Sequence, residues 1–233
     1  MIIALTASEA LLYNNIDKAM LFQNRTQAGE KLALEVAKLA PIDPLVLSLP
    51  RGGVPVGCAV ARMLNWPCDV IPLMKITIPW SPDASYGVVV MDGTMVMNKP
   101  LVHRLELSDA ELEIAANAML LEAKRREQMY RHGKPFPELE GRTVVLADDG
   151  LASGYTMLAA VSFTKKRRPR SIIVAAPVAS ETAYRMLAAD KEIGHIVTLA
   201  RDKEQLFSPA HHYKEFEVLT DDDVVQELSR NRA

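Results

Sequence analysis

The chain alternates between short apolar runs and longer stretches in which apolar residues recur every three or four positions. The short runs suit strands buried on both faces of a parallel sheet, because such strands need no polar face. We therefore expect strands at residues 45–49, 69–73, 143–147, 171–176 and 195–199.

The stretches with helical spacing fall between these runs. Residues 28–39 carry apolar side chains at three- and four-residue intervals, and two prolines follow shortly afterwards. Ser108-Asp109-Ala110-Glu111 has the capping-box pattern, so a long helix is expected to begin there and to continue toward Tyr130. Further helices are predicted at residues 54–64, 156–165 and 181–188.

Strands that alternate with helices imply βαβ crossovers. The fold class predicted is α/β, a doubly wound and mainly parallel sheet with helices on both faces. Asp92-Gly93 between two apolar runs is a hairpin signal, so residues 86–98 are expected to form a small β-ribbon flap that could fold over a site. We expect residues 1–233 to form a single domain, with 1–21 as an N-terminal extension.

Composition narrows the classes of protein that fit. The chain has 233 residues, 49% of them hydrophobic and 24% charged, with a formal net charge of -2, which argues against a nucleic-acid-coating protein. Cys58 and Cys68 have no partner at metal-ligand spacing, so both are expected to be reduced core residues. The start of the chain has no basic leader, and no stretch approaches the roughly 20 apolar residues that cross a bilayer. A cytoplasmic protein without a membrane partner is expected.

The most informative stretch is residues 144–156, Val-Val-Leu-Ala-Asp-Asp-Gly-Leu-Ala-Ser-Gly-Tyr-Thr. An apolar strand delivers two adjacent carboxylates to the carboxyl end of the sheet, where open α/β sheets bind ligands. Gly154 allows the backbone to approach a ligand closely, and hydroxyl groups stand on either side of it beside the free amides of a helix N-terminus. These features predict a cradle for one phosphate group.

The two carboxylates, Asp148 and Asp149, would repel a phosphate at close range, so they need another role. They can accept hydrogen bonds from a diol and face a developing positive charge. A ribose 5-phosphate unit presents both a diol and a phosphate. The alternative is that both acids cap the following helix and fill a loop, but the Ser-Gly-Tyr-Thr turn after them favours the ribose phosphate.

This run resembles the 5-phosphoribosyl diphosphate signature of type I phosphoribosyltransferases, in which apolar residues precede two acids and a Thr/Ser-Gly-x-Thr turn. The resemblance implies that Asp148 and Asp149 hold the ribose hydroxyls and act as indirect ligands of a Mg²⁺ ion that the substrate carries. The turn would hold the 5-phosphate through Gly150, Leu151, Ala152, Ser153, Gly154, Tyr155 and Thr156.

A second turn, at residues 49–55, occupies the place of the family's diphosphate loop after the first core strand. The resemblance implies that Arg51, Gly52 and Gly53 bind the departing diphosphate. Because stabilising a leaving group contributes to rate, Arg51 is a better candidate for rate than the distant histidines. Lys75 would be a secondary diphosphate contact. The similarity to a branch of predicted phosphoribosyltransferases extends over most of the chain from Phe22 onward.

The implied activity is Mg²⁺-dependent transfer of a phosphoribosyl group from phosphoribosyl diphosphate to a nitrogenous base or amine by a homodimer, within nucleotide metabolism. Members that act on hypoxanthine or guanine carry an acid at the position of Ala152, whereas adenine- and uracil-type members do not, so the acceptor stays open. The alternative function is a non-catalytic sensor or regulator that binds the sugar diphosphate or a nucleotide. His211 and His212 are interpreted as a surface turn, with a cover for the acceptor pocket as their functional alternative.

Overall fold

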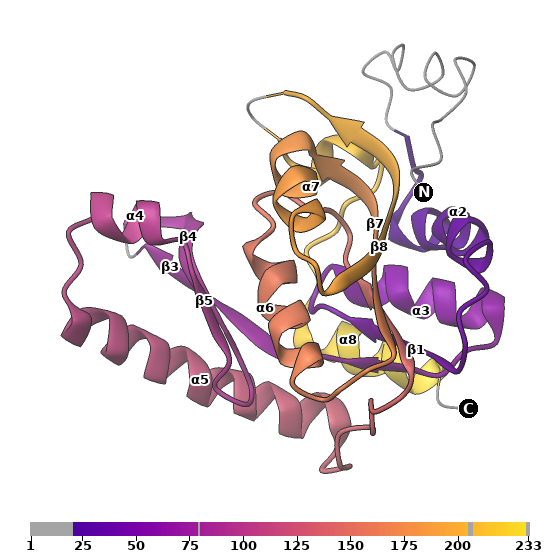
Figure 1. The fold of residues 1–233 in the computed structure, drawn as a ribbon, viewed down its shortest axis with the longest axis horizontal. Helices are drawn as coiled ribbons and strands as arrows, with labels where there is room; N and C mark the ends of the chain where they lie inside the picture. The colour runs from indigo at the N-terminus through magenta and orange to yellow at the C-terminus, as the bar shows by residue number, and fades with distance from the viewer. Residues whose placement is uncertain (1–20, 79, 205–206, 232–233) are drawn as a thin grey trace.

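The computed structural model describes residues 21–78, 80–204 and 207–231. Its main sheet has five strands, all paired in parallel, in the order β2-β1-β6-β7-β8 (Figure 1). Their bounds are β1 Pro44–Ser48, β2 Cys68–Val70, β6 Thr143–Ala147, β7 Ser171–Ser180 and β8 Ile193–Asp202. The predicted α/β class with a parallel sheet is confirmed.

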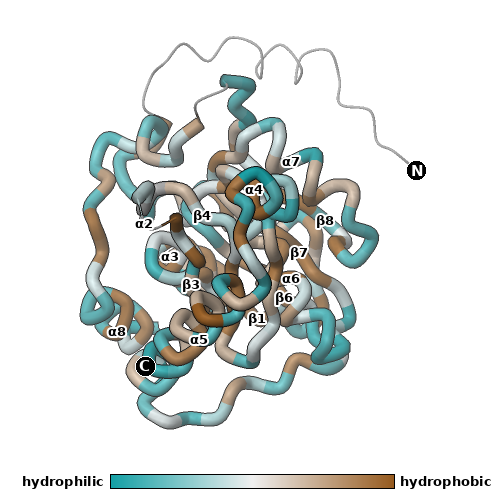
Figure 2. Tube along the Cα trace, turned by 90° about the vertical axis from the view of Figure 1, so that its left-hand side faces the viewer, coloured by the Kyte–Doolittle hydropathy of each residue, from teal (hydrophilic) through white to brown (hydrophobic). Residues whose placement is uncertain are grey.

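Helices cover both faces of this sheet because its central strands are apolar on both sides. Val46, Val145 and Ile173 face one layer, while the residues beside them in each strand face the other. The first layer holds α2 Arg25–Ala37 and α3 Gly53–Leu64; the second holds α6 Tyr155–Lys165 and α7 Glu181–Ala188. Figure 2 shows the apolar strands in the middle of the molecule, with hydrophilic segments around them.

The part of the chain that follows β2 and precedes β6 forms an arm that projects from the main sheet (Figure 1). It consists of an antiparallel sheet, β3 Leu73–Ile78, β4 Ser81–Val90 and β5 Met95–Met97, followed by α4 Lys99–Arg104 and α5 Asp109–Arg131. Ile76, Ile78 and Tyr86 form a small core of its own with apolar residues of α4 and α5. The capping box predicted at Ser108 is present at the start of α5.

The prediction of one strand at residues 69–73 is wrong. The chain leaves the main sheet after Val70 and enters the antiparallel sheet at Leu73. Pro72 lies between the two, and proline cannot donate a hydrogen bond that would continue a ladder.

The C-terminal part returns to the core through η1 Pro209–His212 and α8 Asp221–Arg230, neither of which the sequence analysis predicted. Val224 and Leu228 of α8 are buried against α3 and the end of α5. Among the described residues, no helix is both long and apolar enough to traverse a bilayer. Cys58 and Cys68 are free thiols with their sulfur atoms 3.8 Å apart.

Candidate functional site

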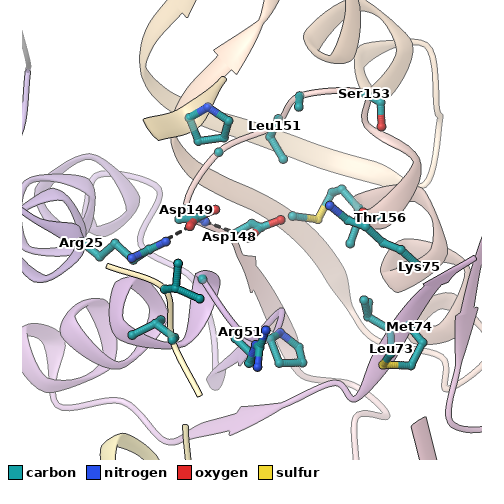
Figure 3. Close-up of a pocket in the computed structure, with 18 of the residues that line it drawn as sticks. Arg25, Arg51, Leu73, Met74, Lys75, Asp148, Asp149, Leu151, Ser153 and Thr156 are labelled. Atoms are coloured by element: carbon teal, nitrogen blue, oxygen red, sulfur yellow. Dashed lines mark hydrogen bonds and ion pairs between the residues drawn. The ribbon is translucent and has the colours of Figure 1, made fainter. Parts of the chain in front are cut away.

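A cavity of about 760 Å³ opens at the carboxyl end of the main sheet. It lies where the strand order reverses, between the loops that follow β1 and β6, which is where α/β sheets of this kind bind ligands. Figure 3 shows the lining side chains pointing inward from several elements. Of the predicted site residues, Arg51, Gly52, Lys75, Asp148, Asp149, Gly150, Leu151, Ala152, Ser153, Gly154 and Thr156 line this cavity.

Two predicted residues, Gly53 and Tyr155, are not part of the cavity lining. A Cβ atom at Gly53 would lie 2.6 Å from the carbonyl oxygen of Ala147, so this glycine is needed where α3 packs on the end of β6. Tyr155 packs against the hydrophobic core instead.

The loop after β6 is fixed by hydrogen bonds to the end of β7. The amide of Leu151 donates to the carbonyl oxygen of Val178 at 2.9 Å, and the amide of Ser180 donates to that of Leu151 at 2.8 Å. The Ser180 hydroxyl donates to the carbonyl oxygen of Ala152 at 2.6 Å. These bonds hold the backbone amides of the loop in place before any ligand binds.

Two α-helices begin at the cavity without a side-chain cap. The N-cap residue is Gly52 for α3 and Gly154 for α6, and neither has a side chain that could accept a hydrogen bond from a first-turn amide. The other α-helices of the described residues each have a capping side chain, from Asn24, Asn98, Ser108, Ser180 and Thr220. The N-terminus of α6 is therefore a ready-made anion site. At α3 the amides of Gly53 and Val54 already donate to the carbonyl oxygens of Leu49 and Arg51, and Pro55 has no amide hydrogen, so within the described residues the free amides of that loop are those of Arg51 and Gly52.

Gly154 was predicted to let the backbone approach a ligand closely, and the structure shows that it is also enclosed by protein. It is buried, its φ is +82°, and a Cβ atom there would lie 3.3 Å from the sulfur of Met186. A larger side chain at this position would therefore strain the backbone and press on α7.

The Arg51 turn packs directly on the two acids. A Cβ atom at Gly52 would collide with the Asp149 carboxylate, so only glycine fits. The amide of Leu49 donates to the carbonyl oxygen of Ala147 at 2.8 Å, which joins the two loops, and the peptide bond before Arg51 is cis. The diphosphate-loop candidate and the acid pair are therefore one continuous surface.

Arg25, at the start of α2, is a site residue that the sequence analysis did not single out. Its Nε donates to Asp149 Oδ2 at 2.8 Å and its Nη1 to the carbonyl oxygen of Glu217 at 2.9 Å. The guanidinium also lies 3.7 Å from the ring centroid of Phe216. These partners lie far away in the sequence, so no local spacing could have indicated them.

The two acids differ in their electrostatic surroundings. Burial, and then the charge of Asp149, raise the pKa of Asp148 well above its usual range, although Lys75 and Arg25 oppose the shift. Asp149 is paired with Arg25, and its carbonyl oxygen accepts a 2.6 Å hydrogen bond from the Tyr213 hydroxyl. Asp148 is the acid whose ionisation a bound cation or hydrogen-bond donor would favour most.

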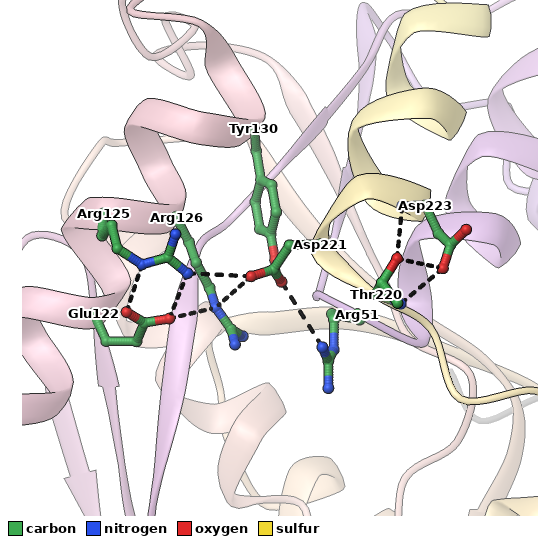
Figure 4. Close-up of polar contacts among 8 residues, drawn as sticks. All are labelled: Arg51, Glu122, Arg125, Arg126, Tyr130, Thr220, Asp221 and Asp223. Carbon is green, nitrogen blue, oxygen red and sulfur yellow. Dashed lines mark hydrogen bonds and ion pairs between the residues drawn. The ribbon is translucent and has the colours of Figure 1, made fainter.

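A second polar group lies beside the cavity, around Asp221 at the start of α8 (Figure 4). Its carboxylate lies 3.9 Å from Arg51 Nη1, 3.2 Å from Arg125 Nη2 and 3.5 Å from Arg126 Nε. The Tyr130 hydroxyl donates to it at 2.5 Å. Arg126 lines the cavity and was not predicted. The helix α8 was not predicted either, but the capping-box pattern Thr220-Asp221-Asp222-Asp223 could have indicated it.

Neither the ribbon at residues 86–98 nor the pair His211 and His212 covers the cavity. The ribbon turn packs on the end of α6, where Arg167 pairs with Asp92 at 3.2 Å. None of residues 86–98 lines the cavity, whose arm-side wall comes from β3 and α5 instead. His212 pairs with Asp202 at 3.3 Å, burial lowers its pKa, and His211 is exposed.

Fold and site together define a class: an open α/β sheet with an acid pair, an uncapped helix N-terminus and an arginine-bearing loop at its switch point is the arrangement of proteins that bind phosphate esters. The profile of the phosphoribosyl transferase domain matches residues 19–214. The chain therefore belongs to the type I phosphoribosyltransferase family, as its sequence signature predicted.

Individual relatives agree with this assignment. MT0597 and Rv0571c, from Mycobacterium tuberculosis strains CDC 1551 and H37Rv, are provisionally described as phosphoribosyl transferases and are 33% identical over 210 residues, 90% of this chain. The chain spans about half the length of these curated relatives, 47%. The crystal structure of TT1426 from Thermus thermophilus is 35% identical, with a TM-score of 0.73 over 91% of this chain and 99% of that one.

Proposed function

We propose that this chain transfers the 5-phosphoribosyl group of phosphoribosyl diphosphate to a nitrogenous acceptor and releases diphosphate. The observation that carries the proposal is that the uncapped N-terminus of α6 and the Arg51-Gly52 loop before α3 border one cavity. Two anion sites with an acid pair beside them match a substrate that has a phosphate at one end, a diphosphate at the other and a diol between them.

The residues have distinct tasks in this reaction. The bond from C1 to the diphosphate oxygen breaks, and a bond from the acceptor nitrogen to C1 forms. Asp148 and Asp149 accept hydrogen bonds from the ribose hydroxyls and face the positive charge that develops at C1. The Arg51 side chain and the free amides of Arg51 and Gly52 stabilise the negative charge that grows on the leaving diphosphate. The amides at the start of α6 hold the 5-phosphate in place.

Magnesium fits the chemistry of these donors, because carboxylate and phosphate oxygens are the ligands it prefers. When bound, Mg²⁺ would neutralise diphosphate charge and make diphosphate a better leaving group. Across residues 21–78, 80–204 and 207–231 there is no cluster of three or more His, Cys, Asp or Glu side chains suited to a metal ion. Substrate oxygens would therefore supply most of the ligands, with Asp148 and Asp149 contributing through water.

The test is diphosphate release from phosphoribosyl diphosphate and Mg²⁺ in the presence of a panel of bases and amines. Arg51→Ala should lower kcat by roughly 10²-fold, the scale expected for one preorganised donor, with a smaller loss of substrate affinity. Arg185→Ala, which removes an exposed arginine of α7 outside the cavity lining, is the matched control and should leave kcat unchanged. A sensor would release no diphosphate with any acceptor, and its Arg51→Ala variant would show a defect in affinity alone.

A further inference from the structure

We propose that Arg126, on the arm helix α5, is a third cationic contact for the diphosphate, beside Arg51 and Lys75. All three side chains line the same cavity. The inference rests on the proposed phosphoribosyl transfer and adds a residue that comes from the arm rather than from the loops of the main sheet.

The geometry places Arg126 and Arg51 on one carboxylate. Arg126 Nε lies 3.5 Å from Asp221 Oδ2, and Arg51 Nη1 lies 3.9 Å from the other oxygen of the same group. Figure 4 shows the two guanidinium groups extending to the same side of Asp221. Asp221 is thus a positioning residue that holds both cations at one wall of the cavity.

Arg126 has hydrogen-bonding capacity to spare. Its Nε donates to Glu122 Oε1 at 3.1 Å. Its two terminal nitrogens donate no hydrogen bond to the part of the chain that the structure describes. A guanidinium can donate five hydrogen bonds in a planar fork that matches two phosphate oxygens. The side chain is only 16% exposed, and it is part of the cavity lining.

Three arginines on this wall compete for the same acids, and Asp223 beside them is already hydrogen-bonded within its capping box. Arg51, Arg125 and Arg126 share two acids, Asp221 and Glu122. Hydrogen bonds from Arg125 lower the pKa of Glu122 to about 2, so that acid stays ionised and paired with Arg125. Lys75 adds a positive charge without an ion pair in the described residues. On the opposite wall Arg25 is paired with Asp149, so the cavity cations without a close ion pair of their own lie on the side of β3 and α5.

Arg125 provides a natural control for this proposal. It is the next residue along α5 and pairs with the same two acids, at 2.7 Å to Glu122 and 3.2 Å to Asp221. It is 51% exposed and does not line the cavity. Loss of either arginine disturbs the ion pairs, but only loss of Arg126 removes a cavity donor.

The experiment compares wild type with Arg126→Ala, Arg126→Lys and Arg125→Ala by calorimetry, each with Mg²⁺ and one of three probes. The probes are phosphoribosyl diphosphate, inorganic diphosphate and ribose 5-phosphate. Arg126→Ala should weaken binding of the first two by roughly 10-fold or more, the effect of losing a charge-assisted contact, and leave ribose 5-phosphate unchanged. Arg126→Lys should recover part of the loss, and Arg125→Ala should bind all three probes as wild type does.

Three outcomes would overturn the inference. These are undiminished diphosphate binding by Arg126→Ala, an equal loss for ribose 5-phosphate, and an equal loss in Arg125→Ala, which would make the effect a structural one. Arg51→Ala measured alongside separates the two proposals: if it loses phosphoribosyl diphosphate affinity and Arg126→Ala does not, only the role of Arg126 fails. A wild-type protein that binds none of the probes would overturn the proposed function and this inference with it.

Discussion

Asp148 and Asp149 are neighbours in the sequence but have different surroundings. Asp149 forms a 2.8 Å ion pair with Arg25, and both side chains are nearly buried, at 13% and 10% exposure. Asp148 has no ion pair with any described residue, and burial disfavours its charged form. The sequence predicted both acids as one functional unit, because the partner that distinguishes them lies 124 positions away.

Asp148→Asn should stabilise the metal-free protein while weakening phosphoribosyl diphosphate binding. A carboxyl whose pKa is raised by folding contributes stability at low pH and loses it as pH rises toward the folded-state pKa. The stability gain of the variant should therefore be near zero at about pH 4, close to the unfolded pKa, and should grow as the pH is raised. Thermal unfolding in EDTA across this range measures the gain, and a gain that shrinks with rising pH would contradict the assignment.

Asp149→Asn should have the opposite effect on stability. It leaves the nearly buried Arg25 guanidinium, stacked on Phe216, without its carboxylate partner. We expect a loss of about 2 kcal/mol, since a charge-assisted hydrogen bond is weakened rather than removed. Urea unfolding at pH 7 measures the loss, and Glu113→Gln on the exposed side of α5 is a control that should change nothing. Equal stability changes in the Asp148 and Asp149 variants would show that their surroundings do not differ as described.

At the scale of elements, the helices differ in whether a side chain caps their N-terminus. Ser108 caps α5 with a box that closes on Glu111, and Thr220 caps α8 with a box that closes on Asp223. The helices α3 and α6 have glycine at the same position. Capping side chains satisfy the first amides of the other described α-helices, including α2 and α8, which also begin beside the cavity. The omission of a cap at α6 leaves amides free inside the cavity.

Thr220→Ala and Ser108→Ala should separate a cap that only stabilises from one that also serves the site. Each removes one capping hydroxyl, at an expected cost of about 1 kcal/mol. Thr220 immediately precedes Asp221, so its loss should also loosen Arg51 and Arg126 and weaken diphosphate binding. Ser108 lies at the opposite end of α5 from Arg126, so its variant should bind diphosphate normally. Unfolding and calorimetry on both variants check this, and parallel losses of affinity would argue against it.

The sequence predicted elements well where the signal was local. The strands at residues 45–49 and 143–147 were expected because their apolar runs are uninterrupted, and both lie in the main sheet. The split between β2 and β3 was missed because a strand-like run continues past Pro72, and only the tertiary structure shows that its two halves belong to different sheets.

At the scale of the whole molecule, three parts of the chain that are distant in sequence surround one cavity. They are the loops at the end of the main sheet, the arm with β3 and α5, and residues 216–219 before α8. The first part could be predicted, because a signature of consecutive residues carries it. The other two could not, because Arg126 meets Asp221, and Arg25 meets the Glu217 backbone, only through long-range packing.

Because three separate parts of the chain line the cavity, each ligand should protect a different set of regions from hydrogen exchange. In the proposed binding mode ribose 5-phosphate contacts the loop after β6, so it should slow exchange at residues 149–156 alone. Phosphoribosyl diphosphate is proposed to extend to Arg51, Lys75 and Arg126, so it should also protect residues 124–131 of α5 and, through Asp221, the start of α8. A ligand slows exchange wherever its binding makes local opening less favourable, so the pattern maps the contacts it stabilises.

The ribbon turn provides an internal reference for that experiment. Residues 91–94 belong to the arm but pack on the end of α6, outside the cavity lining, so neither ligand should change their exchange. Inorganic diphosphate should then give the complement of the ribose 5-phosphate pattern, with protection at α5 and α8 and little at residues 149–156. Protection of α5 by ribose 5-phosphate, or protection by phosphoribosyl diphosphate that stops at the loops of the main sheet, would mean that the arm does not take part in binding. The three-part cavity would then be a feature of packing alone.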